Sequence, residues 1–160
     1  MAKLTDLKAS SRRFIDRYPF PELGLPALCK LSKPLSACRV VLITTAGLHL
    51  KEDKPFSGSF LLSDCSFRRL PASARLADMD ISHTSEEFNR SGIMEDLNVV
   101  YPIDRLEELI EQRKLGSVAP NHYSFMGSLP RVGELKKKTA PEVARLAKSD
   151  DVDLAILTPV

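Results

Sequence analysis

The chain has 160 residues, of which 43% are apolar and 28% are charged, and its 23 basic and 21 acidic residues give a net charge of +2. These values are typical of one globular domain with its own core, and they exclude disorder for the middle of the chain. Basic and acidic residues are mostly interspersed, the amino terminus lacks a secretion signal, and no apolar run approaches the ~20 residues of a membrane span. We therefore expect a cytoplasmic protein with neither nucleic acid nor a membrane as partner.

Residues 1–38 are expected to form an amino-terminal arm or helical segment. Apolar residues recur at helical spacing near the start of the chain, at Leu4, Leu7, Phe14 and Ile15. The pattern stops at "YPFPELGLP" (18–26), because three prolines and a glycine in this stretch are incompatible with a regular helix.

Residues 39–160 are expected to form an α/β domain with a mainly parallel sheet flanked by helices. "RVVLITTAG" (39–47) predicts a buried strand, because it is rich in β-branched residues and ends with a glycine. Residues 48–71 lack a stable period and predict a long connection. "DMDISH" (78–83) predicts a short strand, and "NVVYP" (98–102) predicts another short strand or the entry into a helix.

A helix is predicted at about 103–115. Asp104 and Glu107 have the spacing of a capping box, an apolar stripe follows, and Gly116 is expected to close the helix. The next segment, 117–130, predicts a short strand and a loop.

A second helix, at about 140–148, is predicted to begin at Thr139 as its N-cap residue. The lysine run in 134–140 is expected to be a solvated helix start or loop. "DVDLAILTPV" (151–160) then predicts a strand, with residues 154–157 inside the sheet. Strands that alternate with helices in this order favour parallel pairing.

The cysteines and histidines do not predict a metal site. The cysteines form an odd set without C-x-x-C spacing, which favours reduced, small, partly buried side chains: Cys29, Cys38 and Cys65. The histidines are scattered, without the spacing of a ligand pair: His49, His83 and His122.

The carboxyl ends of parallel strands hold the ligand crevice in sheets of this class, and this rule selects the candidate site residues. All three histidines follow strand-like segments. A hydrogen-bonded loop histidine is the simpler interpretation for each one alone, but their shared placement makes a functional interpretation equally good. Besides the histidines, the crevice is expected to receive Thr44, Thr45, Gly47 and Ser124. No nucleophile elbow, P-loop or dinucleotide-binding motif is present.

Five blocks of the sequence resemble the selenoprotein B family of glycine, sarcosine and betaine reductases, which includes the selenium-containing subunit of D-proline reductase. They are "VVLITTAGLHLKEDKPF", "SDCSFRRLP", "DISHTS", "EDLNVVYPIDRLEELIEQRKLGSVAPNHYSFMG" and "APEVARLAKSDDVDLAILTPV", and they lie in order within residues 39–160. Two features depart from the family pattern: Ser63 and Cys65 flank Asp64, and residues 85–94 match poorly. These departures concern the substrate more than the fold.

The resemblance implies reductive cleavage of a C–N bond in a small amino acid or its N-methyl derivative. In the family, a pyruvoyl group on a partner subunit activates the amine, a selenolate or thiolate attacks the α-carbon, and a thiol reductant protein restores the nucleophile. No cofactor is expected in this chain itself. By the same resemblance, His49 and His122 are candidate catalytic residues. Thr44, Thr45, His83 and Ser124, which the strand-end rule selects, are expected to bind substrate.

The resemblance also places a selenocysteine directly after the strand equivalent to "DLAILTPV" (153–160), with a cysteine three positions later. Selenocysteine is encoded by UGA, which ordinary gene reading takes as a stop. The expectation is therefore an amino-terminal part of a selenoprotein, truncated after Val160, in which an incomplete domain ends on a strand.

Two other functions remain open at this stage. One is a non-catalytic interaction subunit that binds a partner through the exposed edge of the sheet. The other is a small-molecule-binding α/β domain that uses the same strand-end crevice. The sequence leaves open whether the chain is itself an enzyme.

Overall fold

The computed structural model describes residues 5, 7–19, 24–25, 29–57, 63–83 and 90–160. The chain divides into two compact units, Met1–Lys30 and Leu31–Val160. Within the described residues, no helix is both long enough and apolar enough to cross a bilayer.

The first unit contains helix α1 (Ala9–Arg17), which lies within the predicted helical segment but begins after Leu7. The helix ends where Tyr18 takes an extended conformation, directly before Pro19. This end agrees with the proline-rich stop signal in the sequence. Leu4, the first residue of the predicted apolar pattern, lies outside the described residues.

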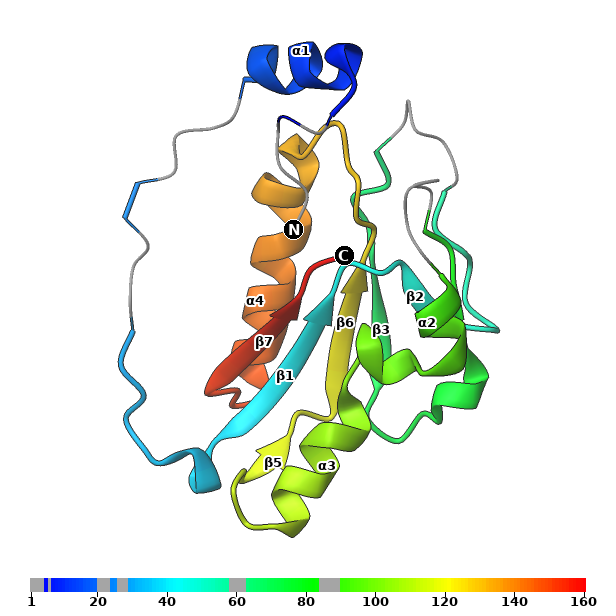
Figure 1. The fold of residues 1–160 in the computed structure, drawn as a ribbon. Coiled ribbons are helices and arrows are strands. Elements are labelled where there is room, and N and C mark those ends of the chain that lie inside the picture. Colours follow the sequence, from blue (N-terminus) through cyan, green and yellow to red (C-terminus); the bar gives the residue numbers. More distant parts are fainter. Residues whose placement is uncertain (1–4, 6, 20–23, 26–28, 58–62, 84–89) are drawn as a thin grey trace. The chain divides into compact units, whose positions relative to one another are not determined.

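The second unit is built on a five-stranded sheet (Figure 1). Strand β1 (Arg39–Thr44) has parallel neighbours on both sides, β7 (Leu154–Thr158) on one and β6 (Asn121–Phe125) on the other. The short strand β5 (Ser117–Val118) pairs in parallel with the amino end of β1. Strand β3 (Phe67–Pro71) is antiparallel to β6. The predicted α/β fold with a mainly parallel sheet is confirmed.

Helices cover opposite faces of this sheet. Because side chains alternate along a strand, Val40 and Leu42 of β1 point to one face and Val41 to the other. The first face packs against helix α3 (Ile103–Glu111), and the second packs against helix α4 (Ala140–Ser149). All three β1 residues are fully buried, which explains why this strand is apolar at successive positions.

Residues 48–71 are not one long connection, so that prediction was wrong. They contain β2 (Leu48–Leu50) and β3, and β2 pairs in antiparallel fashion with β4 (Met79–Ile81) in a separate two-stranded sheet. The strands were missed because β2 has only three residues and β3 carries two arginines. One of these, Arg68, stacks its guanidinium over the Phe56 ring at 4.2 Å, which holds a charged side chain on a strand.

The segment before α3 is a 3-10 turn, Leu97–Val99, that follows the short helix α2 (Ser91–Glu95). It is the entry into α3 rather than a strand, as one of the two alternatives predicted. The predicted capping box does not form. Instead, the Asn98 side chain accepts a hydrogen bond from the Asp104 backbone N–H at 3.1 Å and donates one to the Asp104 carboxylate at 2.8 Å.

Helix α3 ends at Glu111, earlier than predicted, and Gly116 does not close it. Arg113 takes the left-handed conformation after the helix, with φ 56°. Gly116 has another role, because a Cβ at this position would lie 2.7 Å from the Cys38 carbonyl oxygen. A close approach of two backbone segments, rather than helix capping, therefore requires this glycine.

Helix α4 is confirmed, and Thr139 stands at its N-cap position, but the Thr139 side chain makes no capping hydrogen bond. Thr139 has helical angles, φ −76° and ψ −38°, and belongs to a π-helical turn, Leu135–Thr139, that runs directly into α4. The three lysines of this turn are exposed, as predicted for a solvated helix start.

Strand β7 is less buried than predicted. Residues alternate between half-buried and exposed, and Leu157 is 67% exposed. Among the described strands, β7 has only β1 as a partner, so it lies at an edge of the sheet (Figure 1). The apolar run predicted a strand buried on both faces, and this is correct for β1 but wrong for β7.

Candidate functional site

Three parallel strands end at the same edge of the sheet, which we call the carboxyl edge. Thr44 of β1 pairs in register with Ser124 of β6 on one side and Thr158 of β7 on the other. The three strands therefore present a row of hydroxyl groups at one level and on one face. The chain continues from Thr44 to Thr45, whose Oγ1 accepts a hydrogen bond of 2.9 Å from the Val160 backbone N–H.

Gly127 lies where the segments that leave these strands meet. A Cβ at this position would lie 2.7 Å from Nε2 of His83 and 2.9 Å from the carbonyl oxygens of both Thr45 and Val160. His83, which follows β4, is 4% exposed. Four elements that are distant in the sequence thus converge on one point. We call Thr45, His83, Gly127 and Val160 the carboxyl-edge cluster.

The imidazole of His83 is held in its neutral form near neutral pH. Burial lowers its pKa first, and the nearby positive charge of Arg90 lowers the pKa further. The Arg90 guanidinium also donates a hydrogen bond to the His83 carbonyl oxygen. A neutral histidine at the carboxyl edge can accept or donate a proton, which suits acid–base chemistry.

His49 lies within β2, and both of its ring nitrogens already have partners in the protein. Nδ1 is 2.7 Å from the carbonyl oxygen of Leu50, and Nε2 is 2.7 Å from the hydroxyl of Ser82. A carbonyl oxygen can only accept a hydrogen bond, so Nδ1 of the neutral ring carries the proton. Gly47 makes this placement possible, because its φ of 68° turns the chain from β1 into β2.

His122 is fully buried in β6. Its ring, rather than a backbone carbonyl of β6, accepts a hydrogen bond from strand β1. The backbone N–H of Leu42 in β1 donates a hydrogen bond of 2.9 Å to Nδ1 of His122. Pro120, just before β6, has no N–H and separates β5 from β6 at this level. Burial lowers the pKa of His122 to about 4, so the ring is neutral at pH 7.

The structure thus divides the predicted site residues into three places. Thr45 and His83 belong to the carboxyl-edge cluster, while Thr44 and Ser124 lie in the hydroxyl row beneath it. His122 lies deeper in the core, and His49 lies in the small sheet. The roles assigned to all six residues remain predictions.

Sequence reasoning missed Gly127 and Arg90. Gly127 had a detectable signal, because a glycine directly after a strand often marks a close approach of backbone segments. Arg90 had none, since its contact with His83 depends on how the chain folds back.

Cys38 and Cys65 are buried, as predicted, whereas Cys29 is exposed and departs from the prediction. Cys65 lies just before β3, at the carboxyl edge, and its thiol donates a hydrogen bond of 3.4 Å to the Arg131 carbonyl oxygen. Among the described residues, no three His, Cys, Asp or Glu side chains gather as metal ligands would.

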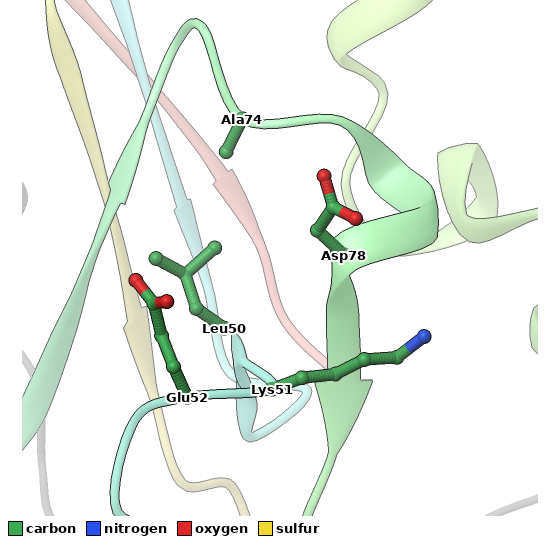
Figure 2. A pocket seen from close by; sticks show the side chains of 5 residues that line it. All are labelled: Leu50, Lys51, Glu52, Ala74 and Asp78. Atoms are coloured by element: carbon green, nitrogen blue, oxygen red, sulfur yellow. The ribbon is translucent and has the colours of Figure 1, made fainter.

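A surface hollow of about 340 Å³ lies at the other end of the β2–β4 pair (Figure 2). It is lined by Leu50, Lys51, Glu52, Ala74 and Asp78. Two of its charges have partners within the chain: Lys51 donates a hydrogen bond to the Ala77 carbonyl oxygen, and Asp78 pairs with Arg75. The hollow therefore offers few free polar groups to a ligand, and the carboxyl edge is the better candidate site.

The sequence is similar to the D-proline reductase subunit gamma of Acetoanaerobium sticklandii, with 34% identity over 133 residues. The aligned region covers 83% of this chain and 53% of that relative, so the chain spans about half the relative's length. No family model and no solved structure matches the chain. The similarity supports a relationship between this chain and the reductase family of that subunit.

Proposed function

We propose that the chain is part of a subunit of a D-proline reductase-type enzyme, and that its carboxyl-edge cluster forms one wall of the active site. The observation that carries this proposal is the convergence of Thr45, His83, Gly127 and Val160 at the carboxyl ends of parallel strands. Sheets of this class hold their ligands at that edge. The 34% identity to D-proline reductase subunit gamma supports the type of reaction.

The proposed reaction opens the ring of D-proline by a two-electron reduction. A selenolate or thiolate attacks the α-carbon, the bond from this carbon to nitrogen breaks, and its electron pair goes to nitrogen, which takes up a proton. A second thiolate then attacks the selenium or sulfur atom. The bond from that atom to the α-carbon breaks, the α-carbon keeps its electron pair and takes up a proton, and a selenenylsulfide or disulfide forms. The product is 5-aminopentanoate, and a thiol reductant protein reopens the oxidised pair.

Within this chain, His83 is the residue best placed to move a proton. Its Nε2 faces the point where Thr45, Gly127 and Val160 meet, and its lowered pKa keeps the ring neutral. The Thr45 hydroxyl is held by the Val160 N–H and fixes the path of the chain at this edge. A pyruvoyl group on a partner subunit would supply a carbonyl that withdraws electrons from the substrate amine. The proposed setting is a cytoplasmic complex of several subunits.

We also propose the identity and place of the nucleophile. It is a selenocysteine that follows Val160 in the complete gene product, with a cysteine three positions later, as in the selenoprotein B family. Two observations support this: the aligned region covers 53% of the relative, and the Val160 carbonyl belongs to the carboxyl-edge cluster. Reading the gene beyond codon 160 should reveal UGA and then an open frame. A UAA or UAG codon, or a frame that closes within a few codons, would refute this placement.

The reaction itself is tested by assembling the complete gene product with its pyruvoyl-containing partner, D-proline and a dithiol. We expect D-proline to be converted into 5-aminopentanoate, which mass spectrometry detects. The control replaces D-proline with L-proline. A complex that is correctly assembled but leaves D-proline unchanged would contradict the proposed function.

A second candidate function, an interaction subunit, is favoured by the β7 edge. Leu157 is 67% exposed and Val160 is 44% exposed, although both are apolar and lie on or beside a strand with one described partner. An exposed strand edge with apolar side chains is a ready surface for another chain. This function is compatible with the first, since a reductase subunit also binds its partners.

We expect Leu157→Ser to leave the stability of the fold nearly unchanged but to weaken the association of another chain with the β7 edge. The side chain contributes little to the core because it is mostly exposed, so the free energy of unfolding should change by less than about 0.5 kcal/mol. Urea unfolding and sedimentation velocity measure the two effects. Leu109→Ser on α3, where the leucine is 36% exposed, is the control away from the strand edge. Association that is equally strong in the Leu157→Ser variant would exclude the β7 edge as the interface.

A further inference from the structure

Several buried polar side-chain atoms have no hydrogen-bond partner within the described part of the chain, and three of them lie on fully buried residues of the core. These three are Nε2 of His122, the hydroxyl of Tyr101 and the hydroxyl of Ser124. The residues are 0%, 1% and 0% exposed, respectively, so bulk water does not reach them. Buried polar atoms of this kind are rare in folded proteins, and ordered water usually satisfies them.

These groups lie on the same side of the sheet. His122 and Ser124 are two residues apart in β6, so they point to the same face. The Tyr101 ring packs edge-on against the His122 ring, with 5.7 Å between the centroids. Ser124 is in register with Thr44 and so belongs to the hydroxyl row at the carboxyl edge. Tyr101, His122 and Ser124 thus supply unpartnered polar atoms on one face of the sheet, and we call these three residues the buried polar layer.

The hydrogen-bond pattern fixes which group His122 presents to this layer. The Leu42 backbone N–H can only donate, so Nδ1 of His122 must accept and carries no proton. The neutral ring therefore has its proton on Nε2. Whatever lies beside Nε2 must accept a hydrogen bond, and a metal ion is excluded because a protonated nitrogen cannot bind it.

We propose that ordered internal water occupies the buried polar layer, accepts a hydrogen bond from Nε2–H of His122 and bonds to the Tyr101 and Ser124 hydroxyls. Water fits this position because it both accepts and donates hydrogen bonds. A direct bond between Tyr101 and His122 is not present, since both atoms lack partners in the edge-on arrangement. Burial also raises the pKa of Tyr101 strongly, so its hydroxyl remains a neutral donor at pH 7.

The sign of a stability change distinguishes a hydrated layer from a dry one. In a hydrated layer, Tyr101→Phe removes a hydrogen bond to water, and the equilibrium constant for unfolding should rise about fivefold. In a dry layer, the same change removes an unpaired hydroxyl from the core and should lower this constant. Urea unfolding of the two chains at pH 7 measures the difference. An unchanged or lower unfolding constant would overturn the proposal.

Tyr123→Phe is the matched control. Tyr123 is also in β6 and 1% exposed as a residue, but it points to the opposite face and its hydroxyl is not among the unpartnered atoms. We expect a change of less than about twofold in its unfolding constant.

If the Tyr101→Phe variant fails to fold, a crystal structure tests directly whether water occupies the buried polar layer. A high-resolution crystal structure of the unmodified chain should show a water peak within hydrogen-bond distance of both Nε2 of His122 and the Tyr101 hydroxyl. Empty density at that position would overturn the proposal.

Discussion

Gly127→Ala is expected to destabilise the chain and to disrupt the carboxyl edge. The new Cβ would lie 2.7 Å from His83 Nε2 and 2.9 Å from two backbone carbonyl oxygens, distances that real Cβ atoms essentially never show. His83 is 4% exposed and cannot turn into solvent, so the backbone must shift. Overpacking of this kind costs about 1–3 kcal/mol of stability. A displacement of ~1 Å at the site should reduce D-proline turnover by about 10²-fold.

Gly133→Ala is the matched control for this substitution. In the described part of the chain, nothing lies within 4 Å of a Cβ at that position, so stability and turnover should stay near the values of the unmodified protein. Urea unfolding gives the stability, and product formation in the assembled complex gives the turnover. Equal behaviour of the two alanine variants would show that the contacts around Gly127 do not matter for either property.

Acidification is expected to destabilise the chain through His122. Its pKa is about 4 in the folded protein, below the usual 6.5, so the unfolded chain binds the proton more tightly between these values. The stabilising contribution is therefore complete above pH 6.5 and is lost as the pH falls through about 4. A shift of this size corresponds to about 3 kcal/mol, most of which is lost by pH 4.5. Protonation also turns Nδ1 into a donor facing the Leu42 N–H, so their hydrogen bond cannot persist.

The variant His122→Asn isolates this effect from other titrating groups. Its side-chain oxygen can take the place of Nδ1 and accept the Leu42 N–H, but it does not titrate. Burial also lowers the pKa of His83, so His83 adds to the acid sensitivity of both chains in the same direction. The loss of unfolding free energy between pH 7 and pH 4.5, measured with urea, should be smaller for the asparagine variant. An equal loss in both chains would rule out His122 as the source.

The fold was predictable where one interaction dominates a segment. The β-branched run of β1 reflects its burial inside the sheet, and the apolar stripe of α4 reflects its packing against the sheet. Both elements were predicted correctly. Strand β3 was missed because its two arginines break the apolar pattern, and its pairing with the distant strand β6 leaves no local signal. Local signals also failed where another side chain provides the hydrogen bond, as when Asn98 accepts the Asp104 backbone N–H and no capping box forms.

The positions of the candidate site residues were predictable in part, whereas their roles stay predictions. The rule about carboxyl ends of parallel strands selected Thr45 and His83, which the structure brings to one point. The same rule selected His122, which the structure places in the core with Leu42 as partner. Sequence cannot separate these cases, because whether a strand residue faces a crevice or the core depends on the register between β1 and β6.

The central claim, that the reaction takes place at the carboxyl edge, is tested most directly by comparing variants of the assembled complex. The measurement is the rate of 5-aminopentanoate formation from D-proline by the complete gene product with its partner. We predict that His83→Phe lowers this rate by at least about 10²-fold, the usual contribution of a positioned acid or base. We predict that Lys51→Ala in the surface hollow leaves it unchanged. Loss of turnover in the Lys51→Ala variant and full turnover in the His83→Phe variant would contradict the account.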